Sequence, residues 1–534
     1  MASSRAQPDP GRTRLLRAAA AGVGLIFAGP FVYLLVRNVG SSGAMWDAMG
    51  APGARASLGR SLVLGIAVAV SASAIGTAAS WLVARTDLPG RALWRVLLPL
   101  PLVIPSFIGA FVLIAAFAPG GVLESALGMQ GLPAVSGFAG SFATLTLFTY
   151  PYVYLPAMAR LRQLPASLEE SARLLGMGPV QTFFAVVLPQ ARSAILAGSL
   201  LVFLYTISDF GVVQLMRYRA LTRVIYSTRL FDSVTSLALS LQLAVLALVV
   251  VSAERALAGR SGHVRTARRG PALRIRLGAW RFPGLVFIAA LVGLSLLVPI
   301  AVLSWWAVRG FVGGTRAPAE LAAALSELAG PALNTSISSV AAAAVALAVV
   351  MPVAYLSVRT RSRVGDVVNA VVVAGFAIPG LTLALALVFW TLAAPAPVGA
   401  LYQTVPLLVA AYTIHFGAHS LRSAQVAIGA VPPQVDEAAS TLGARRLRRL
   451  VAVELPLMLP GLLAGSGLVL LSAMKELPAT LLLAPAGWGT LATEIWTATE
   501  SALFADASIA ALLLIALSGV LTWALVIRRS DSLV

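Results

Sequence analysis

The sequence alternates apolar runs of about 20 residues with short polar segments, and this alternation restricts the fold more than any other feature. A helix of that length spans the hydrocarbon core of a bilayer. Only 11% of the 534 residues are charged and 59% are hydrophobic, whereas about a quarter of an ordinary soluble domain is charged. We therefore predict an all-α integral membrane protein with about twelve transmembrane helices, near residues 17–36, 61–84, 96–117, 138–158, 190–210, 233–253, 283–307, 335–358, 367–392, 401–421, 457–476 and 505–527.

The distribution of Lys and Arg predicts the orientation, because basic residues are enriched in cytoplasmic loops. With the amino terminus inside, the inner segments hold roughly three times as many Lys and Arg as the outer ones. Both termini are then cytoplasmic, and we interpret 17–36 as an uncleaved first helix because no small-residue cleavage site follows it. The net charge of +19 reflects this topology and does not indicate nucleic-acid binding. The main outer basic group either steers an acidic partner or is simply solvated; it comprises Arg217, Arg219, Arg223 and Arg229.

Two segments repeat at a constant offset of 267. The segment PASLEESARLLGMGPVQTFFAVVLPQ begins at Pro165, and PPQVDEAASTLGARRLRRLVAVELPL begins at Pro432. Each follows the fourth predicted span of its half and lies on the cytoplasmic side. Because each half has an even number of spans, we predict two parallel six-helix repeats. The predicted parts are a first half 1–257, a basic linker 258–282 and a second half 283–534.

Local residue chemistry predicts how each repeated segment folds. Ser167 followed by Glu170 is a capping-box pattern, which predicts the start of a short helix there. The second copy has Gln434 at the capping position, so its first turn is less well determined. Gly176 suits a left-handed helix end, and Pro189 suits the first turn of the next membrane helix.

These segments resemble the coupling loops of ABC importer permeases, which carry the pattern Glu-Ala-Ala, three residues, Gly, nine residues, an aliphatic residue, one residue, Leu-Pro. The first copy departs from the pattern only at Ser171, a small residue in place of the middle alanine. The resemblance covers the whole chain and indicates two such permeases fused in one polypeptide. The matching positions are Glu170, Ala172, Gly176, Leu188 and Pro189, and then Glu437, Ala438, Ala439, Gly443, Leu455 and Pro456.

The resemblance implies a type I ABC importer permease fold in a bacterial cytoplasmic (inner) membrane. It implies that the loops 165–189 and 432–456 insert into grooves on a separate ATPase dimer at the cytoplasmic face. It further implies that an extracytoplasmic binding protein delivers the substrate.

The energy source is expected to lie in another subunit. A phosphate-binding loop needs a lysine after its glycines, and the only lysine, Lys475, follows no glycine-rich run. We therefore expect this chain to be no enzyme and to hold no catalytic residue, cofactor or metal site.

Asp209 and Glu476 are related by the same offset and lie near the ends of two predicted spans. Acids in such positions are candidates for a translocation path. They either contact substrate or act as a gate or structural element, and Glu476 also has Lys475 as a possible neighbour.

The sequence segments around Asp209 and Glu476 resemble one particular group of ABC importer permeases. KELPATLLL, GWGTLATEIW and SDFGVVQLM are similar to segments of ferric-iron importer permeases. Ferric iron is therefore the expected substrate, and thiamine, polyamines and phosphonates remain alternatives.

His415 and His419 lie four residues apart, a spacing that can present two imidazoles to a metal. No acid lies nearby, and the first half has Phe148 at the position of His415. Polar packing is the preferred interpretation.

A secondary transporter is the alternative from another class, since it also uses repeated spans. It would be expected to carry ionisable groups at mid-membrane, and the acids of this chain fall at loop edges. A membrane enzyme would need clustered acids or histidines at one depth, which the sequence does not supply.

Overall fold

The computed structural model describes residues 10–40, 42–128, 131–259, 275–312, 318–360 and 362–522, and these are nearly all helical. Eight of the described helices are long and apolar enough to cross a membrane, or up to ten if each of two bent pairs is one span. The predicted all-α membrane fold is confirmed. The other two predicted spans are largely helical as well: 138–158 is divided between two 13-residue helices, and of 401–421 the residues from Val405 onward lie in the helix Val405–Ala430.

The chain forms two compact units, and each unit takes helices from both sequence halves. Unit 1 comprises Met1–Ser42, Ala322–Trp496 and Leu513–Val534, and unit 2 comprises Gly43–Leu321 and Thr497–Leu512. In unit 1, the first helix α1 (Pro10–Val39) packs against α18 (Ala329–Tyr355), α19 (Arg363–Gly375) and α20 (Gly380–Ala393). The division into halves at 257 and 283 concerns the sequence repeat and stays a prediction; most of the linker, 260–274, lies outside the described residues.

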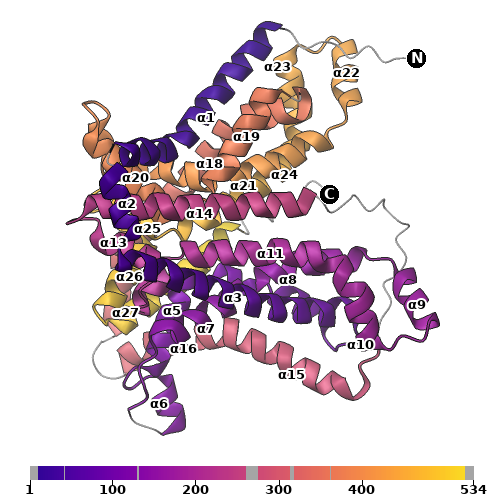
Figure 1. The fold of residues 1–534 in the computed structure, drawn as a ribbon, viewed down its shortest axis with the longest axis vertical. Coiled ribbons are helices and arrows are strands. Elements are labelled where there is room, and N and C mark those ends of the chain that lie inside the picture. The colour runs from indigo at the N-terminus through magenta and orange to yellow at the C-terminus, as the bar shows by residue number, and fades with distance from the viewer. Residues whose placement is uncertain are drawn as a thin grey trace. The chain divides into compact units, whose positions relative to one another are not determined.

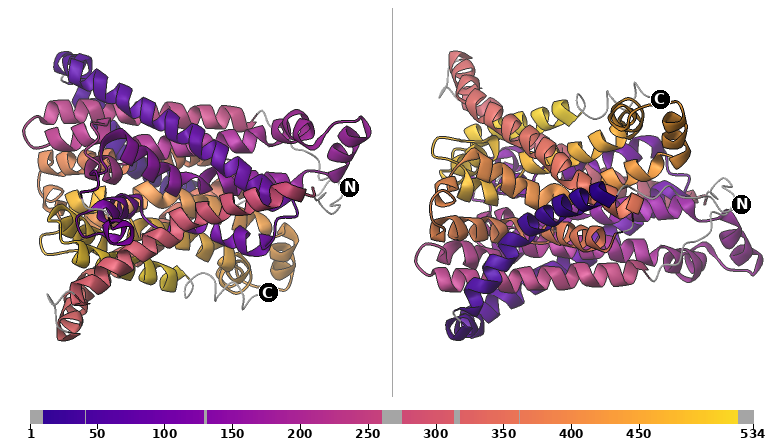
Figure 2. Two further views of the ribbon diagram at one scale, coloured as in Figure 1. Left: turned by 90° about the horizontal axis from the view of Figure 1, so that it is seen from below. Right: turned by 90° about the horizontal axis from the view of Figure 1, so that it is seen from above.

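Unit 2 is organised around three mutually packed helices, α3 (Pro52–Arg85), α8 (Pro151–Gln163) and α11 (Leu188–Ser208) (Figure 1). A 32-residue apolar run, Gly278–Arg309, passes through α15, the π-helical turn η4 and α16 as one long helix (Figure 2). The other elements of this unit are α2 (Ser42–Gly50), α4 (Arg91–Leu97), η1 (Leu100–Val103), α5 (Ser106–Phe117), α6 (Val122–Leu127), α7 (Gly137–Thr149), α9 (Ala166–Leu174), α10 (Pro179–Thr182), η2 (Phe183–Val187), α12 (Gly211–Leu215), α13 (Leu221–Thr228), α14 (Ser233–Gly259), η3 (Gly278–Trp280), α15 (Arg281–Val292), η4 (Gly293–Leu297) and α16 (Val298–Val312).

Unit 1 repeats this arrangement with α18, α21 (Val405–Ala430) and α24 (Leu455–Met474) as its packed centre. Its shorter elements are η5 (Leu356–Thr360), η6 (Gly399–Leu401), α22 (Pro433–Thr441), α23 (Arg446–Arg449), η7 (Leu450–Glu454) and α25 (Pro478–Leu483). Three further helices are divided between the units along the sequence, namely α17 (Pro318–Glu327), α26 (Leu491–Glu500) and α27 (Phe504–Thr522).

Glycine allows the closest helix contact in each packed centre. A Cβ added to Gly198 of α11 would lie 2.7 Å from the carbonyl oxygen of Tyr152 in α8. A Cβ added to Gly465 of α24 would lie 2.5 Å from the Cβ of Ser423 in α21. Small residues let membrane helices approach backbone to backbone. The two glycines lie in equivalent triplets, Ala197-Gly198-Ser199 and Ala464-Gly465-Ser466. Close helix packing therefore explains why this triplet is repeated.

Each unit contains one sharply bent span. The segment Arg91–Val103 meets α5 at 92°, and α19 meets α20 at 103°. Pro105 and Pro379 stand immediately before the second helix of each pair. A residue before proline is pushed out of the helical region, and Ile104 accordingly has ψ 121°. The prolines therefore account for both breaks.

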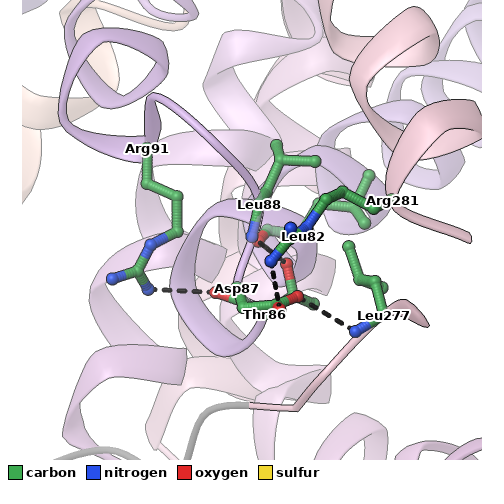
Figure 3. A network of polar contacts seen from close by, with 7 residues as sticks. All are labelled: Leu82, Thr86, Asp87, Leu88, Arg91, Leu277 and Arg281. Atoms are coloured by element: carbon green, nitrogen blue, oxygen red, sulfur yellow. Dashed lines mark hydrogen bonds and ion pairs between the residues drawn. The ribbon is translucent and has the colours of Figure 1, made fainter.

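The last part of the predicted linker 258–282 is fastened next to the end of α3 by a polar network around Asp87 (Figure 3). The Asp87 carboxylate accepts hydrogen bonds from the Leu277 backbone N–H at 3.0 Å and from Arg281 at 2.7 Å. These bonds lower the pKa of Asp87, the Leu277 bond most. Thr86 also pairs with Ile275 in an isolated β-bridge. The entry into α15 is thus fixed against the end of α3.

Replacing Gly198 with Ala should destabilise the protein by about 1–3 kcal/mol, because the new methyl group overpacks the contact between α11 and α8. Thermal unfolding of the purified protein in detergent measures the loss. The matched control is Gly22→Ala in α1, where an added Cβ has nothing within 4 Å and alanine favours the helix. Equal unfolding temperatures for the two variants would contradict the close-contact explanation.

Candidate functional site

The two repeated segments have the same structure, element for element. Helices α9 and α22, α10 and α23, the π-helical turns η2 and η7, and helices α11 and α24 each begin at positions related by the offset of the sequence repeat. In unit 2, α9 and α10 project beyond the ends of α8 and α11 (Figure 2). The repeat read from the sequence is therefore a repeat of backbone structure.

Gly176 and Gly443 end the first short helix of each segment in the left-handed region, with φ of +83° and +76°. In the first copy the N–H groups of Gly176 and Met177 donate to the carbonyls of Arg173 and Ala172 at 2.9 and 3.1 Å. In the second copy the equivalent bonds are 3.0 and 3.1 Å long. An αL residue with this bonding suits glycine, because a side chain would be strained there. The predicted role of Gly176 in ending the helix is confirmed, and Gly443 does the same in the second copy.

The predicted helix start at Ser167 is wrong. Helix α9 begins at Ala166 with Pro165 at its N-cap, and no side chain caps it. Helix α22 likewise has Pro432 at its N-cap without a side-chain cap. Each N-cap proline holds an extended ψ, 136° and 138°, and the helix follows directly. The two copies therefore start in the same register, although only the first contains the capping-box pattern.

At equivalent positions, each segment buries an alanine and exposes a leucine. Ala172 and Ala439 are buried beneath the first helix, whereas Leu175 and Leu442 are 79% and 87% exposed at equivalent positions. Glu170 is also exposed; the side chain of Glu437 lies outside the described residues. Exposed apolar side chains gathered on one projection are typical of a protein-interaction surface.

Pro189 and Pro456 are the second residues of α11 and α24, inside the continuous helical spans Val180–Ser208 and Leu450–Met474. Leu188 and Leu455 are the first residues of these helices, directly after η2 and η7. Each projecting segment is therefore continuous with a membrane helix of its unit.

A buried ion pair fastens the first segment to unit 2. Arg85 is the last residue of α3, and its Nη1 lies 3.3 Å from Oε1 of Glu169 in α9, with both side chains at most 2% exposed. The Nη2 of Arg85 also donates to the carbonyl of Leu164 at 3.0 Å. Burial raises the pKa of Glu169, and the charge of Arg85 offsets part of that rise.

The second segment has an equivalent anchor. Nη2 of Arg359, in η5, donates to the carbonyl of Val431 at 3.0 Å. Under the offset of the repeat, Val431 corresponds to Leu164, and it lies just before α22. The side chain of Asp436, at the position of Glu169, lies outside the described residues.

Asp209 links three parts of unit 2. Its Oδ2 accepts a hydrogen bond from Ser106 at the start of α5, at 2.6 Å, and its Oδ1 accepts one from the N–H of Val212 in α12, at 2.8 Å. Its backbone carbonyl accepts from Thr222 of α13 at 2.8 Å. The carboxylate thus caps α12 and holds it against the second helix of the bent span.

Glu476 makes the corresponding contacts in unit 1. Its Oε1 accepts from the N–H of Ala479 in α25 at 3.2 Å, and its carbonyl accepts from Thr480 at 2.5 Å. The same Oε1 lies 2.7 Å from the position that a Cβ of Gly380 would occupy at the start of α20. The longer Glu side chain therefore fills the space that a side chain at position 380 would need.

The two histidines pack around one aromatic ring. The centroid of Phe376 lies 6.0 Å from that of His415 and 4.9 Å from that of His419. The described residues contain no group of three or more His, Asp or Glu that could hold a metal ion.

Comparison with known proteins places this geometry in a family. Residues 76–261 and 344–529 each match the family described as the binding-protein-dependent transport system inner membrane component. The chain belongs to this family. Its permease unit is present twice, and each copy contains one of the projecting segments.

Individual relatives of this permease are transport proteins of the same type. The Fe(3+)-transport system permease protein FbpB 2 of Haemophilus influenzae is 28% identical over 93% of this chain and 95% of its own length. The sulfate permease protein CysT of Salmonella typhimurium is 27% identical over 38% of this chain and 74% of its own length. The molybdenum permease protein ModB of Azotobacter vinelandii is 32% identical over 27% of this chain and 63% of its own length.

The sequence reasoning missed four residues of this permease that fasten its parts, namely Arg85, Arg359, Ser106 and Gly380. A second offset, slightly larger than the first, would have found them. It places Arg85-Thr86 on Arg359-Thr360 and Ile104-Pro105 on Ile378-Pro379. The offset changes within each half because the loops between these elements differ in length.

Replacing Arg85 with Gln should lower the free energy of unfolding by about 3–5 kcal/mol, because Glu169 is left buried without its cation. Glu169→Gln should cost a similar amount, since it leaves the Arg85 guanidinium, which keeps its charge, buried without its anion. Unfolding of the single and double variants in detergent gives the coupling free energy between the two side chains. Strictly additive losses would show that the ion pair does not hold α9.

Proposed function

We propose that this chain is a membrane subunit of an ATP-driven ABC importer and supplies both of its permease units. In this proposal the loops 165–189 and 432–456 dock on a separate ATPase dimer at the cytoplasmic face, and both termini are cytoplasmic. The observation that carries the proposal is the pair of projecting segments with the same backbone and the same exposed leucine, at Leu175 and Leu442. One docking segment per ATPase subunit matches a dimeric partner.

The contacts within unit 2 suggest how docking would move the membrane part. Arg85 fastens α9 to the end of α3, and η2 continues directly into α11. Helix α11 ends at Asp209, which holds the start of α5 through Ser106. A displacement of the docked loop would therefore be transmitted along α11 to the bent span.

ATP hydrolysis is assigned to the partner. The single lysine, Lys475, closes α24 and does not follow a glycine-rich loop. A separate ATPase is also consistent with the family, whose members are membrane components of binding-protein-dependent transport systems.

Ferric iron is the proposed substrate, delivered by an extracytoplasmic binding protein. The support is the similarity to a ferric-iron permease over nearly the whole chain, against shorter similarities to sulfate and molybdenum permeases. Thiamine, polyamines and phosphonates remain the alternatives from the sequence.

For Asp209 and Glu476 we favour the gate over direct substrate contact. Both carboxylates accept hydrogen bonds from the backbone of the short helix that follows them. These hydrogen bonds hold each carboxylate in place within the protein. Such a fixed carboxylate suits a hinge between the bent span of the unit and the short helix that follows the acid.

Replacing both Leu175 and Leu442 with Asp should abolish co-purification of the ATPase in detergent. Both leucines are exposed, so the substitutions place a charge on the docking surface without disturbing a core. Each single variant should retain part of the ATPase, because one loop still docks. The Glu170→Ala and Glu437→Ala pair tests the polar part of the same surface.

The matched control is Leu230→Asp, an equally exposed leucine at 84% that follows α13. It should leave the ATPase bound. Full retention of the ATPase by the double loop variant would overturn the docking assignment. Transport that persists after ATP depletion would favour a secondary transporter instead.

Uptake into vesicles that contain the permease, its ATPase and its binding protein should accumulate ferric iron in an ATP-dependent manner. An excess of sulfate, molybdate, thiamine or putrescine should not compete. Competition by one of these solutes, without iron accumulation, would reassign the substrate and leave the docking proposal intact.

A further inference from the structure

Unit 2 contains a half-open cavity of about 630 Å³. Its apolar walls include Ile114, Leu215 and Phe504, and its basic residues are Arg217 and Arg223. Figure 1 places α13 at the end of this unit farthest from α9. In the proposed topology the cavity therefore opens on the extracytoplasmic side, away from the ATPase.

The guanidinium groups of Arg217 and Arg223 have no polar partner among the residues that the structure describes. Neither guanidinium forms a hydrogen bond or an ion pair with any residue that the structure describes, and Glu500, which also lines the cavity, lies outside ion-pair distance of both. Burial, together with the like charges of Arg219 and Arg217, lowers the pKa of Arg223. An anion in the cavity would relieve this repulsion.

The backbone of the cavity wall is strained at two points. Arg217 and Ala502 have φ of +55° and +57°, and they are two of the three described non-glycine residues with positive φ. Each closes a short helix by a pair of carboxyl-terminal hydrogen bonds; at the first, Arg217 and Tyr218 donate to Gln214 and Val213. Left-handed non-glycine residues are costly and gather at functional sites.

The second sequence half lacks these charges. Leu221 and Leu491 occupy equivalent places, since their N–H groups donate to the hydroxyls of Ser61 and Thr335 at 2.8 and 2.9 Å. Counting from them, the position of Arg217 is taken by a left-handed glycine, Gly487, and that of Arg223 by threonine. The arginines are therefore not required by the repeated fold.

We propose that this cavity binds a small organic carboxylate through Arg217 and Arg223. Two separate cations suit a molecule with more than one carboxylate, and the apolar walls and the volume favour an organic anion over an inorganic one. Gln214, another lining residue, has a buried amide oxygen without a hydrogen-bond partner among the described residues. It can accept from a hydroxyl of the same ligand.

Isothermal titration of citrate into the full chain in detergent, at constant ionic strength set with sodium chloride, tests the proposal. The unmodified protein should bind citrate, and Arg223→Gln should weaken binding at least about tenfold, as expected for loss of a charge-assisted hydrogen bond. The matched control is Arg219→Gln, which removes a neighbouring charge that does not line the cavity and should leave the affinity within about twofold.

A second variant separates binding from folding. Arg217→Gly removes the charge but keeps a residue that favours positive φ. It should unfold at the same temperature as the unmodified protein, or higher, and still bind citrate more weakly.

Absence of citrate binding at millimolar concentration would overturn the proposal, as would an equal loss in Arg219→Gln and Arg223→Gln. Binding of sulfate as tight as that of citrate would contradict the organic class of ligand. If Arg223→Gln instead weakens only the complex with the binding protein, the arginines form a docking surface and the cavity proposal fails. None of these measurements uses the ATPase, so their outcome is independent of loop docking.

Discussion

A backbone N–H or C=O inside a bilayer has no water to bind and needs a partner within the protein. Unbroken helices meet this requirement automatically, but this chain breaks its helices inside both units. Asp209 and Glu476 stand at two of these interruptions. Each carboxylate accepts from the backbone of the next short helix and also reaches the start of a helix that follows a proline break. One acidic side chain per unit therefore stabilises two interruptions at once.

The two units fill equivalent positions in their folds with different residues. In unit 2 a short acid, Asp209, meets the hydroxyl of Ser106. In unit 1 a longer acid, Glu476, occupies the space left by Gly380. The combined size of the two side chains is nearly the same in both units, whereas neither position keeps its residue. The packing thus constrains the combined size of the two side chains and not either side chain alone. One of the two is an acid in both units, because the following short helix needs a hydrogen-bond acceptor at its amino-terminal end.

Local sequence signals predicted a large part of this structure. Apolar runs located the long helices, and the repeat offset located two segments whose glycines take the left-handed conformation in both copies. The helix start at Ser167 was mispredicted because the N-cap proline determined it instead of the capping box. The contact of Arg85 with the chain before α9 joins residues 79 positions apart, and no periodicity encodes such a pairing. The association of α1 with unit 1 was equally inaccessible, because apolar helix faces carry little information about their partner.

That association has a consequence for biosynthesis. Helix α1 leaves the ribosome before every other described helix, but it packs against α18, α19 and α20, which are encoded more than half the chain later. At a synthesis rate of about 5–20 residues per second, α1 waits roughly 20 to 70 s in the membrane before α20 is complete. During that time its apolar surface faces lipid or other proteins. Unit 1 therefore cannot complete its packing around α1 until α20 has been synthesised. A membrane chaperone or the translocation machinery would contact α1 for longer than it contacts the helices made later.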